Sequence, residues 1–187
     1  MFKVDINSNL HLELLDLAHA KKMFELGQKN KDEFIKWLPW VEKNKSVEDT
    51  KEFIKQSLQN YAKGVEVNCS IFYNSELVGN VSLGGIKKKL GIKKGVVGYW
   101  LDSNFQKRGI MNKSVAKILE IGFEKMGLDK IIIRCDKDNI NSCSVAIRAN
   151  FKLEGLLRED AIVNGKVVDL KQFSLLKKEY FENKNIC

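Results

Sequence analysis

The chain has 187 residues, of which 44% are hydrophobic and 30% charged, and this length and balance suit a single domain over residues 1–187. No run of about 18 apolar residues occurs, which argues against a transmembrane helix. The first twenty residues have no apolar segment and carry an early acidic residue, so they do not resemble a secretory signal, and we expect a cytoplasmic protein.

The cysteines and histidines form no recognisable reactive or metal-binding motif. The four cysteines contain no Cys-x-x-Cys pair and are Cys69, Cys135, Cys143 and Cys187. The only histidines, His11 and His19, lie far from them in the sequence. We therefore expect reduced thiols and no bound metal. The scarcity of histidine also disfavours a Ser-His-Asp or Cys-His enzyme.

The formal net charge of +8 is concentrated most visibly in the segment "KKKLGIKK" over residues 87–94. Such a segment suits either a surface that binds nucleic acid or an exposed turn between two strands. No aromatic residues alternate with these lysines to stack on bases. We therefore favour the exposed turn and do not expect nucleic acid as a partner.

Hydrophobic periodicity and turn residues predict the elements in chain order. Ser46, followed by acidic residues, marks a helix start, Gly127 marks a helix end, and Asn164-Gly165 is typical of a type I′ hairpin. The predicted elements are a strand over 8–14, helices over 16–29 and 46–62, strands over 65–73, 77–86 and 96–101, a helix over 109–126, a strand over 130–135, a helix over 141–149, and strands over 151–163 and 167–176.

The order of these elements predicts an α/β protein built on a mixed sheet. Antiparallel strands in the first half are followed by a strand–helix–strand crossover, which requires parallel pairing in the same sheet. The run "KIIIRC" over 130–135 is apolar throughout, as is typical of a central strand covered on both faces.

The loop that precedes the helix over 109–126 carries two cations and a glycine. The first N–H groups of a helix lack partners and attract anions. Gly109 allows the backbone to approach a ligand closely, and Lys107 and Arg108 add positive charge. The pattern alone fits either a phosphate site or an ordinary helix start. Neither a Walker loop nor a Rossmann glycine motif is present.

The segment "GYWLD", followed by Gln106-x-x-Gly109, resembles the acyl-CoA pyrophosphate loop of the GNAT N-acetyltransferase superfamily. The resemblance extends to its ribosomal-protein N-acetyltransferase (RimJ/RimL-like) branch. The segments that carry it cover residues 34–41, 46–54, 76–83, 97–115, 135–160 and 163–169. It implies the GNAT fold, with a central mixed sheet of six or seven strands flanked by about four helices.

The resemblance also implies a site for acetyl-CoA. Backbone N–H groups in the loop would hold the pyrophosphate of the cosubstrate. The loop residues concerned are Gln106, Lys107, Arg108, Gly109, Ile110 and Met111. The strand residues Tyr99, Trp100 and Leu101 would pair with the pantetheine arm and polarise the thioester carbonyl.

Three further positions match functional residues of the family. Asn139 would contact the cofactor arm, and Ser142 would contact it and protonate the leaving thiolate, although Ser142 also suits a helix N-cap. Cys135 matches a cysteine near the CoA sulfur. Asn150 stands where a glycine is usual.

The general base and the acceptor site are less well marked. Ala161 stands where the related enzymes have an acidic residue, and its neighbours Glu159 and Asp160 are weak alternative bases. Trp37 and Trp40, with the intervening Leu38, suit either the wall of an acceptor cleft or an anchor for the first helices.

The expected function is acetyl-CoA-dependent N-acetylation of a primary amine, foremost the N-terminal α-amine of a ribosomal protein. A protein α-amine has a pKa of about 8, so it needs less help from a base than lysine, at about 10.4. The alternatives are acetylation of a small amine, such as a polyamine, an amino acid or an antibiotic, and an acyl-CoA-binding regulator without catalysis. The resemblance also implies a possible homodimer.

Overall fold

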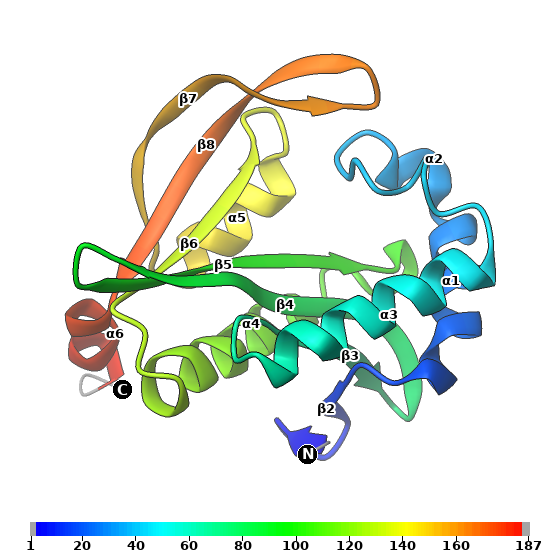
Figure 1. The fold of residues 1–187 in the computed structure, drawn as a ribbon, viewed down its shortest axis with the longest axis horizontal. Helices are drawn as coiled ribbons and strands as arrows, with labels where there is room; N and C mark the ends of the chain where they lie inside the picture. Colours follow the sequence, from blue (N-terminus) through cyan, green and yellow to red (C-terminus); the bar gives the residue numbers. More distant parts are fainter. Residues whose placement is uncertain (1–2, 185–187) are drawn as a thin grey trace.

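The computed structural model describes residues 3–184 and shows one open, eight-stranded mixed sheet with helices packed on it (Figure 1). The strand order is β1-β2-β3-β4-β5-β6-β8-β7. The strands are β1 (Lys3–Asp5), β2 (Leu10–Leu14), β3 (Val67–Tyr73), β4 (Glu76–Lys89), β5 (Ile92–Leu101), β6 (Lys130–Asp136), β7 (Lys152–Val163) and β8 (Lys166–Leu176).

The described residues contain six α-helices, which are α1 (Ala20–Lys29), α2 (Lys31–Phe34), α3 (Val47–Ala62), α4 (Ile110–Glu120), α5 (Ile140–Arg148) and α6 (Lys177–Lys184). Two 3-10 turns cover Leu17–His19 and Ser103–Phe105, and a π-helical turn over Ile121–Lys125 continues α4. In the part of the chain that the structure describes, no helix is both long and apolar enough to cross a membrane.

The predicted mixed α/β sheet is confirmed, and three short elements are additional. Strand β1 pairs with β2 and brings the sheet to eight strands, one above the expected range. Helix α2 is a single turn, too short to show a periodic pattern. Helix α6 has no buried residue, so a search for an amphipathic face overlooks it. Its Tyr180 ring stacks on Phe123 with centroids 4.9 Å apart, and this contact holds the helix against the core.

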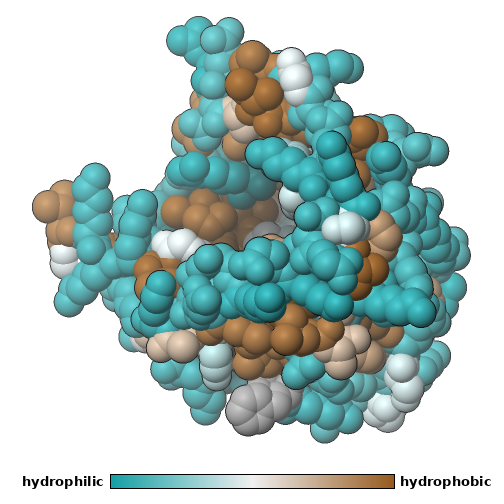
Figure 2. All heavy atoms as spheres, turned by 45° about the vertical axis from the view of Figure 1, so that its right-hand side comes forward, coloured by the Kyte–Doolittle hydropathy of each residue, from teal (hydrophilic) through white to brown (hydrophobic). Residues whose placement is uncertain are grey.

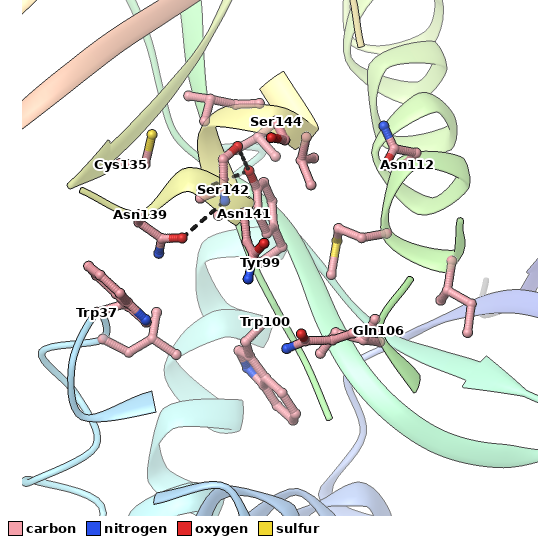
Figure 3. A pocket seen from close by; sticks show the side chains of 18 of the residues that line it. Trp37, Tyr99, Trp100, Gln106, Asn112, Cys135, Asn139, Asn141, Ser142 and Ser144 are labelled. Carbon is pink, nitrogen blue, oxygen red and sulfur yellow. Dashed lines mark hydrogen bonds between the residues drawn. The ribbon is translucent and has the colours of Figure 1, made fainter. Parts of the chain in front are cut away.

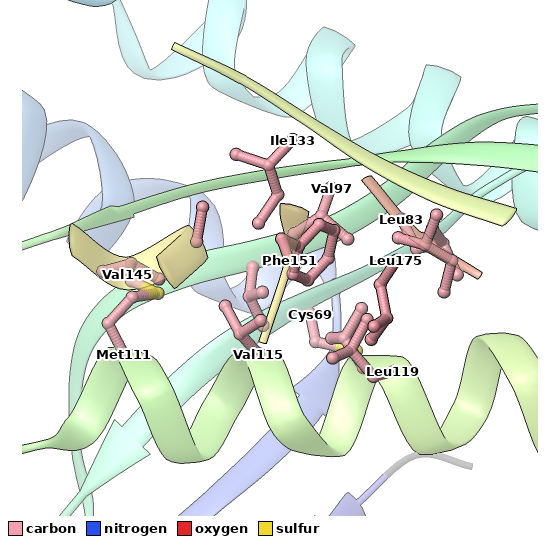
Figure 4. Close-up of a cluster of buried hydrophobic side chains, with 14 of the residues drawn as sticks. Cys69, Leu83, Val97, Met111, Val115, Leu119, Ile133, Val145, Phe151 and Leu175 are labelled. Carbon is pink, nitrogen blue, oxygen red and sulfur yellow. The ribbon is translucent and has the colours of Figure 1, made fainter. Parts of the chain in front are cut away.

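Strand alternation places the two hydrophobic clusters on opposite faces of the sheet. Odd-numbered side chains of β3 and β5, such as Cys69 and Val97, face the larger cluster, which is covered by α4 and α5. The even-numbered Phe72 and Trp100 face the smaller cluster beneath α1 and α3. Figure 4 shows Met111, Val115 and Leu119 of α4 projecting from one side of the helix, as the predicted helical spacing requires.

The turn residues adopt the conformations that their types suggest. Asn164 and Gly165 both have positive φ, 49° and 77°, which confirms the type I′ hairpin between β7 and β8. Asn150, which replaces the usual glycine, has a φ of 61°, and asparagine tolerates this left-handed region better than most residues. The lysine-rich segment is the tip of the β4–β5 hairpin, where Lys88 pairs with Lys93.

Strands β5 and β6 separate after a short parallel contact. They pair only from Lys94↔Lys130 to Val97↔Ile133, although β5 continues to Leu101 and β6 to Asp136. Beyond Ile133, β6 keeps its pairing with β8, and β5 keeps its pairing with β4. The C-terminal end of β5 therefore has no strand partner on its β6 side, and the two strands diverge in Figure 1.

Gly79 allows β4 and β5 to pair closely beside this divergence. It pairs with Leu101, and a Cβ atom at Gly79 would lie 2.5 Å from the carbonyl oxygen of Trp100.

We expect Gly79→Ala to lower the free energy of unfolding by about 1–3 kcal/mol, because the backbone must move to relieve the overlap. Thermal unfolding followed by circular dichroism would measure the loss. Gly84→Ala, on the same strand, is the control, since its Cβ would meet only the Glu66 side chain at 3.7 Å. Equal melting temperatures for the two variants would contradict the interpretation.

Candidate active site

A cavity of about 580 Å³ lies where β5 and β6 diverge, between the starts of α4 and α5 and the segment around α2. Figure 2 shows one face of the molecule hollowed, with hydrophobic side chains below a hydrophilic rim. The cavity size is within the range of small-molecule sites. Most of the predicted site residues line it, namely Trp37, Tyr99, Trp100, Leu101, Gln106, Lys107, Gly109, Ile110, Met111, Cys135, Asn139 and Ser142.

Tyr99 and Ser142 meet inside the cavity (Figure 3). The Tyr99 hydroxyl donates to the Ser142 carbonyl oxygen at 3.1 Å and lies 3.0 Å from Ser142 Oγ. Burial raises the pKa of Tyr99 well above its ordinary value, so the phenol stays protonated. Asn139 caps α5 by accepting the Ser142 N–H at 3.0 Å, so Asn139, rather than Ser142, is the N-cap residue. The Ser142 hydroxyl is thus directed to Tyr99.

The aromatic residues divide into two groups. Trp37 lines the cavity together with Leu38, as expected of an acceptor wall. Trp40 packs instead against the rings of Trp100, at 6.1 Å, and Phe34, at 6.4 Å, and is not among the lining residues. The location of Trp40 fits the alternative interpretation, an anchor that holds the first helices beside β5.

The loop between β5 and α4 is fixed at its start by buried polar contacts. The Asp102 carboxylate, whose side chain is 1% exposed, accepts from Lys29 Nζ at 2.8 Å and from the Asn104 N–H at 3.2 Å. The amide oxygen of Asn30 accepts from the N–H and the hydroxyl of Ser103. The end of α1 therefore holds the loop in position.

The end of the loop forms the helix N-terminus that the sequence indicates. Lys107 and Gly109 have positive φ values of 62° and 73°. No side chain caps α4, in contrast to α3, where Ser46 and Asp49 form a capping box. The first N–H groups of α4 are thus left to an external acceptor.

Arg108 has a different position from its neighbours in the loop. Its guanidinium lies over the Phe105 ring, 5.2 Å from the centroid, and donates to the Asn104 carbonyl oxygen. Arg108 lines a smaller hollow beside Asn7 and Lys113 rather than the main cavity. Its expected contact with the pyrophosphate stays a prediction without support from this arrangement.

Comparison with known proteins decides the family. A family model described as an acetyltransferase (GNAT) domain matches residues 9–152. The chain belongs to the GNAT acetyltransferase family. The ribosomal-protein-serine acetyltransferase of Escherichia coli (strain K12) is 28% identical over 171 residues, which are 91% of this chain and 94% of that protein.

Two solved structures extend the comparison. One is RimL, a ribosomal L7/L12 α-N-protein acetyltransferase, in a complex where coenzyme A is disulfide-linked to a cysteine. The match has a TM-score of 0.89 and 26% sequence identity, and it covers 95% of this chain and 99% of the RimL chain. The other is the microcin C7 self-immunity acetyltransferase MccE with acetyl-CoA and AMP, with a TM-score of 0.85 at 30% identity over 92% and 95% of the two chains. These similarities confirm the resemblance and the fold that the sequence indicates.

Two carboxylates that the sequence did not single out also line the cavity of the acetyltransferase. They are Glu33 and Asp136. Hydrogen bonds from Lys36 and from the Trp37 indole lower the pKa of Glu33, so it is ionised near neutral pH. Both had signals in the sequence: Asp136 ends the apolar strand β6, and Glu33 precedes Trp37 by one helical turn. Within residues 3–184, no three His, Cys, Asp or Glu side chains are grouped closely enough to hold a metal ion.

The predicted weak bases lie outside the cavity of the acetyltransferase. The strand register shifts between Leu157 and Ala161, and Glu159 adopts a φ of 53° in this bulge. Asp160 is exposed and lies 3.6 Å from Arg134 Nη1, while the Glu159 N–H donates to Asp169. Neither side chain is among the lining residues. Their role as bases stays a prediction without support from this arrangement.

Asp102 gives the acetyltransferase a testable pH dependence. Burial alone would raise the pKa of Asp102, but the hydrogen bonds from Lys29 and the Asn104 N–H outweigh it and lower the pKa below its ordinary value. A carboxyl group whose pKa is lower in the folded state than in the unfolded state stabilises the fold at pH values above the unfolded-state pKa. This stabilisation is lost as the pH falls through the folded-state pKa. We expect Asp102→Asn to reduce the free energy of unfolding by about 1–3 kcal/mol at pH 7, with a difference that shrinks below about pH 4.

Urea unfolding at pH 7 and at several pH values from about 4 down to about 2.5 would measure this difference, because the stabilisation is lost only as the pH falls through the lowered folded-state pKa. Glu52→Gln is the control, because the Glu52 carboxylate pairs with Lys55 on the surface with 74% of its side chain exposed. A pH-independent loss in Asp102→Asn would show that charge on Asp102 is not the cause.

Proposed function

We propose that this GNAT acetyltransferase transfers the acetyl group of acetyl-CoA to the α-amine of a protein N-terminus, foremost that of a ribosomal protein. The observation that carries the proposal is the uncapped N-terminus of α4, which opens onto the cavity beside the unpaired end of β5. The names of the E. coli relative and of RimL support the acceptor class.

The donor would be held mainly by backbone. Free N–H groups at a helix N-terminus and the helix dipole favour a pyrophosphate, and Gly109 leaves open space where a side chain would otherwise project. The pantetheine arm would extend along Tyr99–Leu101, where β5 lacks a partner towards β6. The CoA sulfur would then lie beside Cys135, in line with the RimL complex, where CoA is disulfide-linked to a cysteine.

The transfer would proceed by direct attack of the neutral amine on the thioester carbon. Backbone N–H groups of β5 would stabilise the oxyanion that develops on the carbonyl oxygen. The Ser142 hydroxyl, positioned by Tyr99, would protonate the departing CoA thiolate. The proton lost by the amine would then return to Ser142 and restore its hydroxyl. The bond formed is N–C, the bond broken is C–S, and the amine proton ends on the CoA thiol.

The acceptor end of the cavity suits a cationic amine. Glu33 lies there with Trp37 and Leu38, and its lowered pKa keeps it negatively charged at neutral pH. A nearby carboxylate attracts an ammonium group, and an α-amine loses its proton readily because its pKa is about 8. A dedicated strong base is therefore not required for this acceptor, which fits the presence of Ala161 at the position where related enzymes have an acid.

A second candidate acceptor is a small-molecule amine. The similarity to MccE, solved with acetyl-CoA and AMP, favours it, since that enzyme acts in immunity to microcin C7. Small amines with and without an attached nucleotide therefore belong in the same assay as peptides.

The acceptor class is tested by release of the CoA thiol from acetyl-CoA at pH 7. We expect peptides with a free α-amine to react at least about tenfold faster than N-terminally blocked peptides that offer only lysine, because about a tenth of an α-amine is neutral at pH 7 and far less of a lysine amine. Mass spectrometry would locate the acetyl group. Faster transfer to lysine would refute the α-amine assignment, and transfer only to small amines would favour the second candidate.

The donor site is tested by a matched pair of glycine substitutions. Gly109 and Gly127 have φ values of 73° and 65°, and neither would place a Cβ within 4 Å of other atoms. We expect Gly109→Glu to weaken CoA binding by about a hundredfold or more in titration calorimetry, because the carboxylate repels the pyrophosphate at the helix start. Gly127→Glu carries the same backbone strain away from the cavity and should bind CoA normally. Similar affinities for the two variants would exclude this loop as the pyrophosphate site.

A further inference from the structure

Two cysteines lie in contact at the inner wall of the cavity. Cys135 is at the end of β6 and lines the cavity, and Cys143 is on the first turn of α5 and does not. Their sulfur atoms are 3.3 Å apart. Both residues are buried, with 6% and 8% of their surface exposed. Cys143 therefore lies behind Cys135 as seen from the cavity.

The separation of the sulfurs is short enough for them to be joined by a small movement. A disulfide has an S–S distance of about 2.05 Å, so the two atoms need to approach by little more than one ångström. The third described cysteine, Cys69, is fully buried in the core on β3 and lines no part of the cavity. Cys135 thus combines access from the cavity with a second thiol in contact.

We propose that Cys135 and Cys143 form a thiol–disulfide exchange site for a disulfide of CoA bound in the cavity. Cys135 is the attacking residue and Cys143 the resolving residue. Binding of CoA disulfide beside Cys135 rests on the proposed function, which places the CoA sulfur there. The contact between the two thiols is independent of the proposed function.

The exchange has two balanced steps. The Cys135 thiolate attacks one sulfur of CoA disulfide, the S–S bond breaks, and one CoA leaves as a thiolate that takes up a proton. The deprotonated Cys143 sulfur then attacks Cys135 in the mixed disulfide, and the second CoA leaves in the same way. Two protein thiols are oxidised to one disulfide, and one CoA disulfide is reduced to two CoA thiols.

Burial makes this pair selective for a bound disulfide. Loss of hydration raises the pKa of the Cys135 thiol to about 12, so little thiolate is present near neutral pH. A disulfide that collides from solution therefore reacts slowly. A disulfide held in the cavity gains a high effective concentration, which compensates for the small thiolate fraction.

Closure of the disulfide would also disturb the proposed proton donor. Ser142 is the residue before Cys143, and its hydroxyl lies 3.0 Å from the Tyr99 hydroxyl. Movement of the start of α5 towards β6 changes this contact. We expect the oxidised protein to lose most of its acetyl transfer and to regain it after reduction with dithiothreitol.

Peptide mapping tests the site directly. Lys137 lies between the two cysteines, so trypsin places Cys135 on the peptide 135–137 and Cys143 on the peptide 138–148. After treatment of the full chain with CoA disulfide, we expect these two peptides to be linked to each other, with no CoA attached. Cys143→Ala should instead retain CoA on Cys135, and Cys143→Ser is a second variant in case alanine perturbs α5. Cys135→Ala should show neither product, and Cys69→Ala should behave as the parent chain.

The outcomes separate this inference from the proposed function. A stable CoA adduct on Cys135 in the parent chain, or no oxidation of either residue, would overturn the exchange site. The same incubation with glutathione disulfide should give the linked peptides at least about tenfold more slowly, since glutathione lacks the pyrophosphate that the start of α4 is proposed to bind. Equal rates would overturn delivery of CoA disulfide by the cavity, and with it both the CoA specificity of this exchange site and the donor site of the proposed function. The linked peptides would then establish only an oxidisable thiol pair.

Discussion

The active-site region depends on one feature of the sheet, the separation of β5 from β6 after four parallel residue pairs. Each strand keeps its other neighbour, β4 for β5 and β8 for β6, so the sheet remains continuous while a gap opens within it. Buried backbone groups need hydrogen-bond partners, and the end of β5 has none from β6. The separation therefore creates a cavity and supplies its wall with groups that a ligand can satisfy.

The helices on the two faces fix the walls of this cavity. On one face, Lys29 and Asn30 at the end of α1 hold Asp102 and Ser103, and so set the path of the loop that leads to α4. On the other, the side chains of α4 and α5 pack into the larger core and direct both helix starts towards the gap. The donor site thus depends on core packing as much as on the residues that would touch the cosubstrate.

The start of α5 combines several roles within a few residues. Asn139 caps the helix, Ser142 contacts Tyr99 from β5, and Cys143 contacts Cys135 from β6. Helix α5 therefore bridges the two diverging strands across the gap. A chemical change at the cysteine pair would be transmitted to Ser142 through a single peptide unit, because helix residues move together with their backbone hydrogen bonds.

The sequence by itself determined the mixed sheet, the helix after the glycine loop and the hairpin at Asn164-Gly165, because periodicity and left-handed turns are local properties that residue types reveal. The family was indicated by a different signal, the resemblance of segments such as 97–115 and 135–160 to known members, and the family model confirms it. It did not determine β1, α2 or α6, which are too short or too polar to show a pattern and are held by their neighbours. Only the tertiary structure placed Glu33 and Asp136 in the cavity and directed Arg108 away from it, over Phe105. It also left Glu159 and Asp160 outside the cavity on a bulge and brought Cys143 behind Cys135. These outcomes depend on where strands separate and how helices pack across them, which are contacts between distant segments that no local pattern records.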